Sequence, residues 1–259
     1  MSNERQQRAA RAEQMRKERE KADKKQRNLI TVAIVAVVVA LIALAGFAVT
    51  STSNDKKDVT DVIQPAGATK DFGIVYTPED AGAKVKDGAK PVSVELYEDF
   101  QCPACLSFEQ QSGAFLHQQV ESGAISITYR PFSFLDENGG STNEYSHRST
   151  NVALCVLDKG GVKDYVKAHD YLYANQPDEG TDGPTDKELV AAMKSNDITD
   201  ADIQSCVDTS RFVPWIDAAK EAGSDKGVSS TPTVKVAGKT LESPTPQALQ
   251  AAIVEAAKA

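Results

Sequence analysis

Two cysteines separated by two residues, Cys102 and Cys105, place the strongest constraint on how this chain folds. The alternating apolar run from Val92 to Tyr97 predicts a strand just before them. Apolar residues at helical spacing from Cys105 to Leu116 predict a helix after them, and Pro103 suits the first turn of that helix. The pair is therefore expected at a strand-to-helix junction, where the positive end of the helix dipole favours the thiolate of Cys102.

A C-x-x-C pair has three chemical interpretations: a redox site, a structural disulfide, or half of a zinc site. Zinc usually needs four ligands, most often from two such clusters. The remaining cysteines, Cys155 and Cys206, are isolated, and the three histidines show no ligand spacing. The sequence therefore predicts no metal site and favours a redox pair over a structural disulfide.

The chain opens with a basic segment, residues 1–28, followed by an uncharged apolar stretch, residues 29–50. The first 27 residues carry ten Lys or Arg and five Asp or Glu. The apolar stretch would span about 33 Å as a helix, enough to cross a bilayer. The basic flank predicts a single-pass anchor in the cell membrane, with the rest of the chain on the extracytoplasmic side. A cleaved signal peptide, ending near Ala43-Leu44-Ala45, is the alternative, but its apolar core is usually only about 7–15 residues long.

Residues 51–70 are polar and predict a tether, and residues 71–259 are long enough to form one domain with a sizeable core. Beyond residue 50 the chain has 19 basic residues (29 − 10) and 32 acidic residues (37 − 5), a net charge of −13. This charge argues against binding of nucleic acid or anionic lipid by the exported part. An acidic surface also has a simpler interpretation, which is solubility.

Periodicity predicts an α/β order interrupted by a helical insertion at about 135–226. Three helix-start boxes are expected, at Ser141–Glu144, Thr185–Glu188 and Thr199–Asp202. The expected strands are 72–76, 92–97, 125–129, 233–236 and 240–241. The expected helices are 105–120, one through 155–157, 162–174, 186–194, 200–207, 214–222 and a last one from 245 to the end, with Leu249, Ile253 and Val254 inward.

Two motifs in this order resemble the DsbA-type branch of the thioredoxin-like superfamily, in its membrane-anchored bacterial form. They are Tyr97-Glu98-Asp99-Phe100-Gln101-Cys102-Pro103-Ala104-Cys105 and Gly227-Val228-Ser229-Ser230-Thr231-Pro232-Thr233-Val234. The resemblance covers roughly residues 72–258. It implies a thioredoxin-like α/β fold with a helical insertion subdomain, preceded here by a single transmembrane helix, and the activity of a thiol-disulfide oxidoreductase.

The resemblance also implies roles for individual residues. Cys102 matches the exposed nucleophilic cysteine, and Cys105 matches its more buried partner. Substrate contacts are implied for four residues: Pro103, Ala104, Thr231 and Pro232. Pro232 matches the cis-proline of the family, although most X–Pro bonds are trans and the residues alone would predict an ordinary turn.

This sequence departs from the family pattern at two places. The best-known oxidising members have histidine between their cysteines, so Pro103-Ala104 predicts a milder oxidant. A buried acid often lies six residues before the first cysteine, but that position is Leu96. Glu98 and Asp99 lie nearer; we expect a solvated strand end for them, or a part in proton transfer if they act in the site.

Cys155 and Cys206 remain once the C-x-x-C cysteines pair with each other. Because free thiols rarely persist in an oxidising compartment, we expect a structural disulfide between them. It would close a loop of about 50 residues and contribute about 4 kcal/mol in the chain-entropy model. The alternative is two separate buried cysteines that act as small apolar residues.

The sequence therefore predicts an extracytoplasmic oxidoreductase that introduces disulfides into unfolded exported proteins with cysteines. No bound cofactor is expected. The resemblance points to a quinone-linked membrane oxidase of the DsbB or vitamin K epoxide reductase kind as the reoxidising partner. Two alternatives stay open: an exported disulfide reductase or isomerase, and a non-redox binding module whose disulfide is structural.

Overall fold

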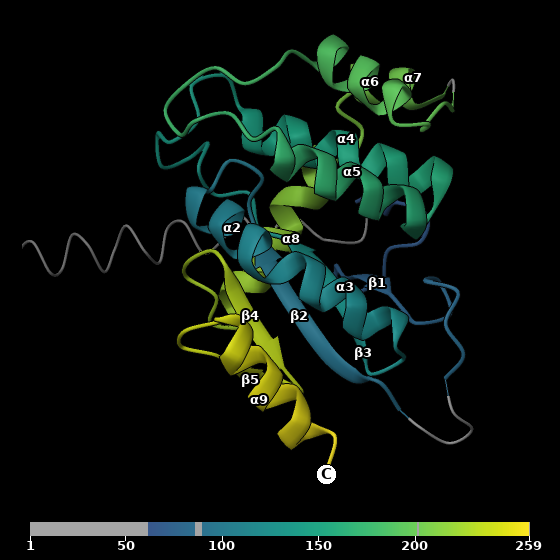
Figure 1. The fold of residues 1–259 in the computed structure, drawn as a ribbon. Helices are drawn as coiled ribbons and strands as arrows, with labels where there is room; N and C mark the ends of the chain where they lie inside the picture. Colours follow the sequence, from purple (N-terminus) through teal and green to yellow (C-terminus); the bar gives the residue numbers. More distant parts are fainter. Residues whose placement is uncertain (1–61, 86–89, 201, 259) are drawn as a thin grey trace, which may run out of the picture. The chain divides into compact units, whose positions relative to one another are not determined.

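The computed structural model describes residues 62–85, 90–200 and 202–258 (Figure 1). The basic segment 1–28, the apolar stretch 29–50 and most of the tether 51–70 lie outside the described residues, so the anchor stays a prediction. Within the described part of the chain, none of the helices combines the length and the hydrophobicity that a membrane crossing requires.

Five strands form one mixed sheet in the order β1-β3-β2-β4-β5. They are β1 (Ile74–Tyr76), β2 (Val92–Glu98), β3 (Ile125–Pro131), β4 (Thr233–Val236) and β5 (Lys239–Thr240). The central strand β2 runs parallel to β3 and antiparallel to β4. Its alternate residues Val94 and Leu96 are buried in the core, as the period of a strand requires. The carboxyl end of β2 leads directly to the cysteine pair.

The helix expected over 105–120 is interrupted. It consists of α2 (Pro103–Phe108), a π-helical turn η2 (Glu109–Gly113) and α3 (Ala114–Glu121). Apolar spacing did not reveal the interruption, because a π turn adds only about one residue to the period. In Figure 1, α3 lies in front of the sheet together with the last helix, α9 (Pro246–Ala256).

Helix α9 begins as expected, with the Thr245 side chain accepting a hydrogen bond from the N–H of Ala248. Leu249 and Ile253 are buried, but Val254 is 45 % exposed. The expectation that Val254 points inward was wrong, because it lies about 100° around the helix from Ile253.

The insertion is helical, as predicted, and forms a layer above the sheet in Figure 1. Its helices are α4 (Tyr145–Gly160), α5 (Val162–Ala174), α6 (Asp186–Ser195) and α7 (Asp202–Asp208). Helix α8 (Val213–Asp225) follows them and leads back to β4.

Of the three expected helix-start boxes, the one at Thr185–Glu188 is confirmed, with both reciprocal hydrogen bonds present. The box at Ser141–Glu144 was wrong. Glu144 is left-handed (φ 59°), and the Ser141 hydroxyl accepts from the N–H of Tyr145.

The box expected at Thr199–Asp202 was also wrong. The N–H of Asp202 donates to the carboxylate of Asp200, two residues earlier. The carboxylate of Asp200 thus accepts the N–H that the box assigned to Thr199, through the contact to the second following residue that aspartate side chains often form.

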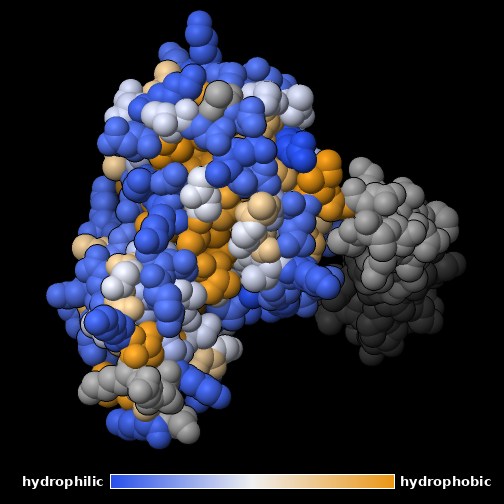
Figure 2. All heavy atoms as spheres, turned by 90° about the vertical axis from the view of Figure 1, so that its right-hand side faces the viewer, coloured by the Kyte–Doolittle hydropathy of each residue, from blue (hydrophilic) through white to orange (hydrophobic). Residues whose placement is uncertain are grey.

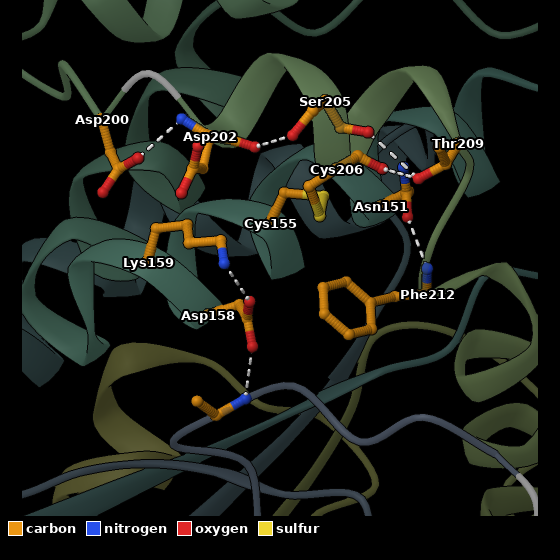
Figure 3. The surroundings of a disulfide bond; sticks show 11 residues. Asn151, Cys155, Asp158, Lys159, Asp200, Asp202, Ser205, Cys206, Thr209 and Phe212 are labelled. Carbon is orange, nitrogen blue, oxygen red and sulfur yellow. Dashed lines mark hydrogen bonds and ion pairs between the residues drawn. A yellow bond between two sulfur atoms is a disulfide. The ribbon is translucent and has the colours of Figure 1, made fainter.

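Helices α4 and α7 are joined by a disulfide between Cys155 and Cys206, with their Cα atoms 5.8 Å apart (Figure 3). Next to it, the side-chain oxygen of Asn151 accepts the N–H of Phe212 at 2.9 Å. These contacts hold the helices of the insertion to one another.

Most of the apolar core is one cluster that spans both the sheet and the insertion. A smaller cluster of Tyr97, Phe132 and Val228 is separate from it. Gly223 of α8 lies against this smaller cluster, where an added Cβ would approach the Phe132 ring to 2.9 Å. On the face in Figure 2, hydrophobic residues form a central band and hydrophilic residues surround it.

Candidate redox site

The cysteine pair lies at the junction of β2 and α2. The N–H of Cys102 donates to the carbonyl of Asp99 at 3.0 Å, and Pro103 occupies the first turn of α2. Both thiols are free. Cys105 is fully buried, and Cys102 is only 6 % exposed. The expectation of an exposed nucleophile was wrong, because segments far along the chain cover it.

One covering segment is the loop before β4. The Thr231–Pro232 peptide bond is cis, and the Cys102 thiol points at the carbonyl of Thr231 at 3.6 Å. Thr231 is 9 % exposed, and Pro232 is half-buried, whereas Pro103 and Ala104 are exposed beside them. The structure thus brings the cysteine pair together with the four residues for which the sequence predicted substrate contacts.

The two thiols differ in acidity. The pKa of Cys102 is lowered to about 6, chiefly because the Cys105 thiol hydrogen-bonds to its sulfur. Burial opposes this effect, while the Thr231 side chain and the first backbone N–H groups of α2 add to it. Burial raises the pKa of Cys105 well above the ordinary value of a thiol. The helix terminus that the sequence pointed to contributes, but the partner thiol contributes more.

Asp99 is the centre of the loop that carries the pair, and it is completely buried. One of its carboxylate oxygens accepts the N–H of Gln101 and the hydroxyl of Ser146. The other accepts the N–H groups of Phe134 and Leu135. Burial raises the pKa of Asp99, although these four hydrogen bonds favour its charged form. Its expected place at a solvated strand end was therefore wrong.

The second covering segment comes from the insertion. The side-chain amide of Gln176 donates to the carbonyl of Cys102 at 3.1 Å. The amide of Gln101 donates in turn to the carbonyls of Asp178 and Thr181. The sequence predicted no contact for either glutamine, because their partners lie 74 to 80 residues away along the chain.

Glu98 is also buried, at 8 % exposed, rather than solvated. Its carboxylate lies 3.4 Å from the Nε2 atom of His169, on α5. Glu109 of η2 is the third member of this cluster. Burial, and next the charge of Glu98, raise the pKa of Glu109 well above its ordinary value. Burial lowers the pKa of His169, but its contacts with Asp170 and Glu98 outweigh burial and raise it to about 10. Nothing in the sequence predicted a role for Glu109 or His169.

Comparison with known proteins agrees with this geometry. A family model described as thioredoxin matches residues 87–255. The reduced form of a disulfide bond oxidoreductase, DsbG from Mycobacterium tuberculosis, is 27 % identical, with a TM-score of 0.61 over 73 % of this chain and 88 % of that one. Oxidised DsbA of the same organism is 27 % identical, with a TM-score of 0.60 over 72 % and 93 %.

More distant similarities show the fold alone or only part of a protein. MdbA, a thiol-disulfide oxidoreductase from Corynebacterium diphtheriae, is 22 % identical, with a TM-score of 0.58 over 77 % of this chain and 99 % of that one. The serine/threonine-protein kinase PknE of Mycobacterium tuberculosis is 24 % identical over 152 residues, 58 % of this chain. That match spans 24 % of the kinase, so the chain covers about a quarter of the length of the curated relatives it matches.

Proposed function

The chain belongs to the thioredoxin family and has the fold of DsbA-type oxidoreductases, and we propose that it introduces disulfides into exported proteins. The observation that carries the proposal is the difference in acidity between the two thiols. Cys102 is held toward the thiolate, with a pKa of about 6, while Cys105 is held as a thiol. Because thiolate stabilisation favours the reduced pair, it makes the oxidised pair a stronger oxidant.

The reaction begins with Cys102 and Cys105 joined as a disulfide. A thiolate of an unfolded substrate attacks the sulfur of Cys102, and the bond to Cys105 breaks. Cys105 takes a proton, since its raised pKa keeps it a thiol. A second substrate thiolate then attacks the substrate sulfur of the mixed disulfide and expels Cys102. Two electrons pass to the protein, the substrate gains one disulfide, and no bound cofactor takes part.

The acidity of Cys102 favours this second step, because a thiol of low pKa leaves readily. The protonated Cys105 competes poorly for the mixed disulfide, so the substrate is released oxidised rather than reduced. Thr231 and Pro232, with Pro103 and Ala104, form the surface that an extended substrate segment would contact. An apolar groove between this surface and the insertion would bind the rest of the extended substrate segment.

The location and partners of the protein are part of the proposal. The uncharged stretch 29–50 with its basic flank supports a single membrane span, with residues 51–70 as a tether and residues 71–259 as an extracytoplasmic domain. A disulfide between Cys155 and Cys206 suits an oxidising compartment. A membrane oxidase of the DsbB or vitamin K epoxide reductase type would then remove the two electrons.

A reductase or isomerase would use the same residues in the opposite direction. The Cys102 pKa of about 6 lies between the values of about 3.5 for a strong oxidant and about 7 for thioredoxin. The reduction potential of the purified protein, equilibrated with glutathione, distinguishes an oxidase from a reductase. We expect a value more oxidising than about −200 mV, whereas a value near −270 mV would establish a reductase.

Trapping tests the chemistry itself. Cys105→Ser is first converted to a mixed disulfide between Cys102 and glutathione. An unfolded substrate with a single cysteine should then attack the sulfur of Cys102, release glutathione as a thiol and accumulate as a mixed disulfide with the protein. Cys102→Ser, treated in the same way, should form none. If the protein were only a binding module, Cys102→Ser would keep full activity and neither variant would trap the substrate.

A further inference from the structure

Three side chains that disulfide exchange does not use meet inside the domain: Glu98, Glu109 and His169. They come from the end of β2, from η2 and from α5. One ligand atom from each lies within 4.8 Å of the other two. The cluster therefore joins the thioredoxin core to the helical insertion.

The spacing within the cluster differs from that of an ordinary ion pair. The His169 Nε2 atom lies 3.4 Å from the nearer oxygen of Glu98, whereas charged N–H···O hydrogen bonds are about 2.7–2.9 Å long. Ligands about 2.1 Å from a tetrahedral metal are separated by about 3.4 Å. The observed separation thus corresponds to one edge of such a site.

Each of the two glutamate carboxylates in the cluster has one oxygen that accepts no hydrogen bond. The Oε1 atoms of Glu98 and Glu109 are buried and have no hydrogen-bond partner. Glu98 as a whole is only 8 % exposed. A buried carboxylate oxygen without a partner carries a large free-energy cost, which a bound cation would remove.

The histidine is oriented as in metal sites. Its Nδ1 atom lies 3.3 Å from the Asp170 carboxylate, which leaves Nε2 for the cluster. Metal-binding histidines usually have a carboxylate or carbonyl on their second nitrogen. Four aromatic rings surround the imidazole with centroids 4.6 to 6.2 Å away and limit the access of water: Phe100, Tyr129, Tyr165 and Tyr173.

The local backbone also fits a built site. The π turn η2 begins at Glu109, and such turns occur often at functional positions. A Cβ at Gly113 would approach the Glu109 carboxylate to 2.5 Å, so glycine leaves room for this side chain. A cavity of about 480 Å³, lined among others by Glu109, Gly113 and Asp170, provides an entry path.

We propose that Glu98, Glu109 and His169 bind one divalent transition-metal ion, with Zn²⁺ the best match. Two carboxylates and one neutral imidazole balance a dication, and zinc accepts this ligand set with water in the fourth position. Calcium prefers six to eight oxygen ligands and does not suit an imidazole. The sequence predicted no metal site, because only ligands that lie close together along the chain form a recognisable spacing. Glu98 and His169 are 71 residues apart.

The test is a titration of the full chain, solubilised, stripped with a chelator and oxidised so that Cys102 and Cys105 offer no thiolate. With Zn²⁺ alone we expect one equivalent to bind. Glu109→Gln and His169→Gln should weaken binding at least about a hundredfold, and Asp170→Asn about 10–100-fold. Glu121→Gln, at an exposed acid ending α3, is the matched control and should bind as the parent does.

Co²⁺ provides a second readout, since a tetrahedral site should give visible absorption bands in the parent that are missing from Glu109→Gln. Circular dichroism shows whether each variant is folded; should His169→Gln fail to fold, Glu109→Gln and Asp170→Asn decide. Absence of binding by the parent would overturn the proposal. Equal affinity of folded Glu109→Gln and Glu121→Gln would overturn it as well.

Discussion

At the scale of single residues, Cys102 depends on groups that come from separate parts of the chain. Cys105 supplies a thiol hydrogen bond from one turn away in α2, and the side chain of Thr231 contributes from the loop before β4. Gln176 of the insertion holds the carbonyl of Cys102. The reactivity of this sulfur is therefore a property of the assembled site, and its pKa is the quantity to measure.

Alkylation of the reduced protein measures that pKa. The rate at Cys102 should follow a titration with a midpoint near pH 6, be constant above about pH 7 and fall about tenfold per unit below the midpoint. Cys105 should stay unreactive over this range, since its pKa is raised. Mass spectrometry locates the label. A midpoint near 8.5, the ordinary value, would contradict the role given to the partner thiol.

Asp99 supports the same site through four hydrogen bonds. Asp99→Asn keeps the shape but places an NH₂ group against N–H donors, so we expect a loss of about 3 kcal/mol in the free energy of unfolding. Chemical denaturation measures it. Asp178→Asn, at an exposed loop position, makes the same chemical change and should lose less than about 0.5 kcal/mol. Similar losses in the two variants would show that the hydrogen bonds of Asp99 contribute little to the free energy of unfolding.

At the scale of elements, the start of α4 is held by side chains rather than by its own cap. His147, in the first turn, contacts Asp136 of the preceding loop and Asp217 of α8. Burial lowers the pKa of His147, but these two carboxylates outweigh burial and raise it. Its protonated form therefore joins three elements.

The raised pKa of His147 has a consequence for stability. A group whose pKa is higher in the folded state stabilises fully below its unfolded value, about 6.5, and loses this contribution as pH rises through the folded-state value. The difference in unfolding free energy between the parent and His147→Gln should thus shrink from pH 6 to pH 9. The oxidised protein is used, so that Cys102 does not titrate. His117→Gln serves as the control, and a difference that grows with pH would contradict the prediction.

At the scale of the whole molecule, the insertion and the thioredoxin core form one structure. The main apolar cluster runs through both, and the Cys155–Cys206 disulfide closes a loop across the insertion. One of the two segments that cover Cys102 comes from this insertion. A folded insertion is therefore needed to cover Cys102 as well as to pack its own helices.

Removal of the disulfide tests this dependence. Cys155→Ala with Cys206→Ala should lower the free energy of unfolding by about 4 kcal/mol, because 51 residues separate the two cysteines. Denaturation with guanidinium measures the loss. Cys102→Ala with Cys105→Ala removes the same number of sulfur atoms, and its loss should be at least about 2 kcal/mol smaller. Equal losses would show that the closed loop contributes nothing of its own.

Much of the fold followed from local patterns. Strand β4 and helix α5 match their expected bounds, because alternation and helical spacing are properties of neighbouring residues. The motifs around Cys102 and Pro232 indicated a thioredoxin-like α/β fold, which the family match confirms. These signals are carried by short segments and need no knowledge of packing.

The tertiary structure alone decided what surrounds the site. Burial of Glu98 and Asp99, the cover over Cys102 and the meeting of Glu109 with His169 all join residues distant along the chain. The sequence does not distinguish a carboxylate in water from a buried one that accepts hydrogen bonds from four N–H and O–H donors. Its environment, and with it its pKa and chemistry, exists only once the insertion packs on the core, because desolvation and hydrogen bonding come from the surrounding residues.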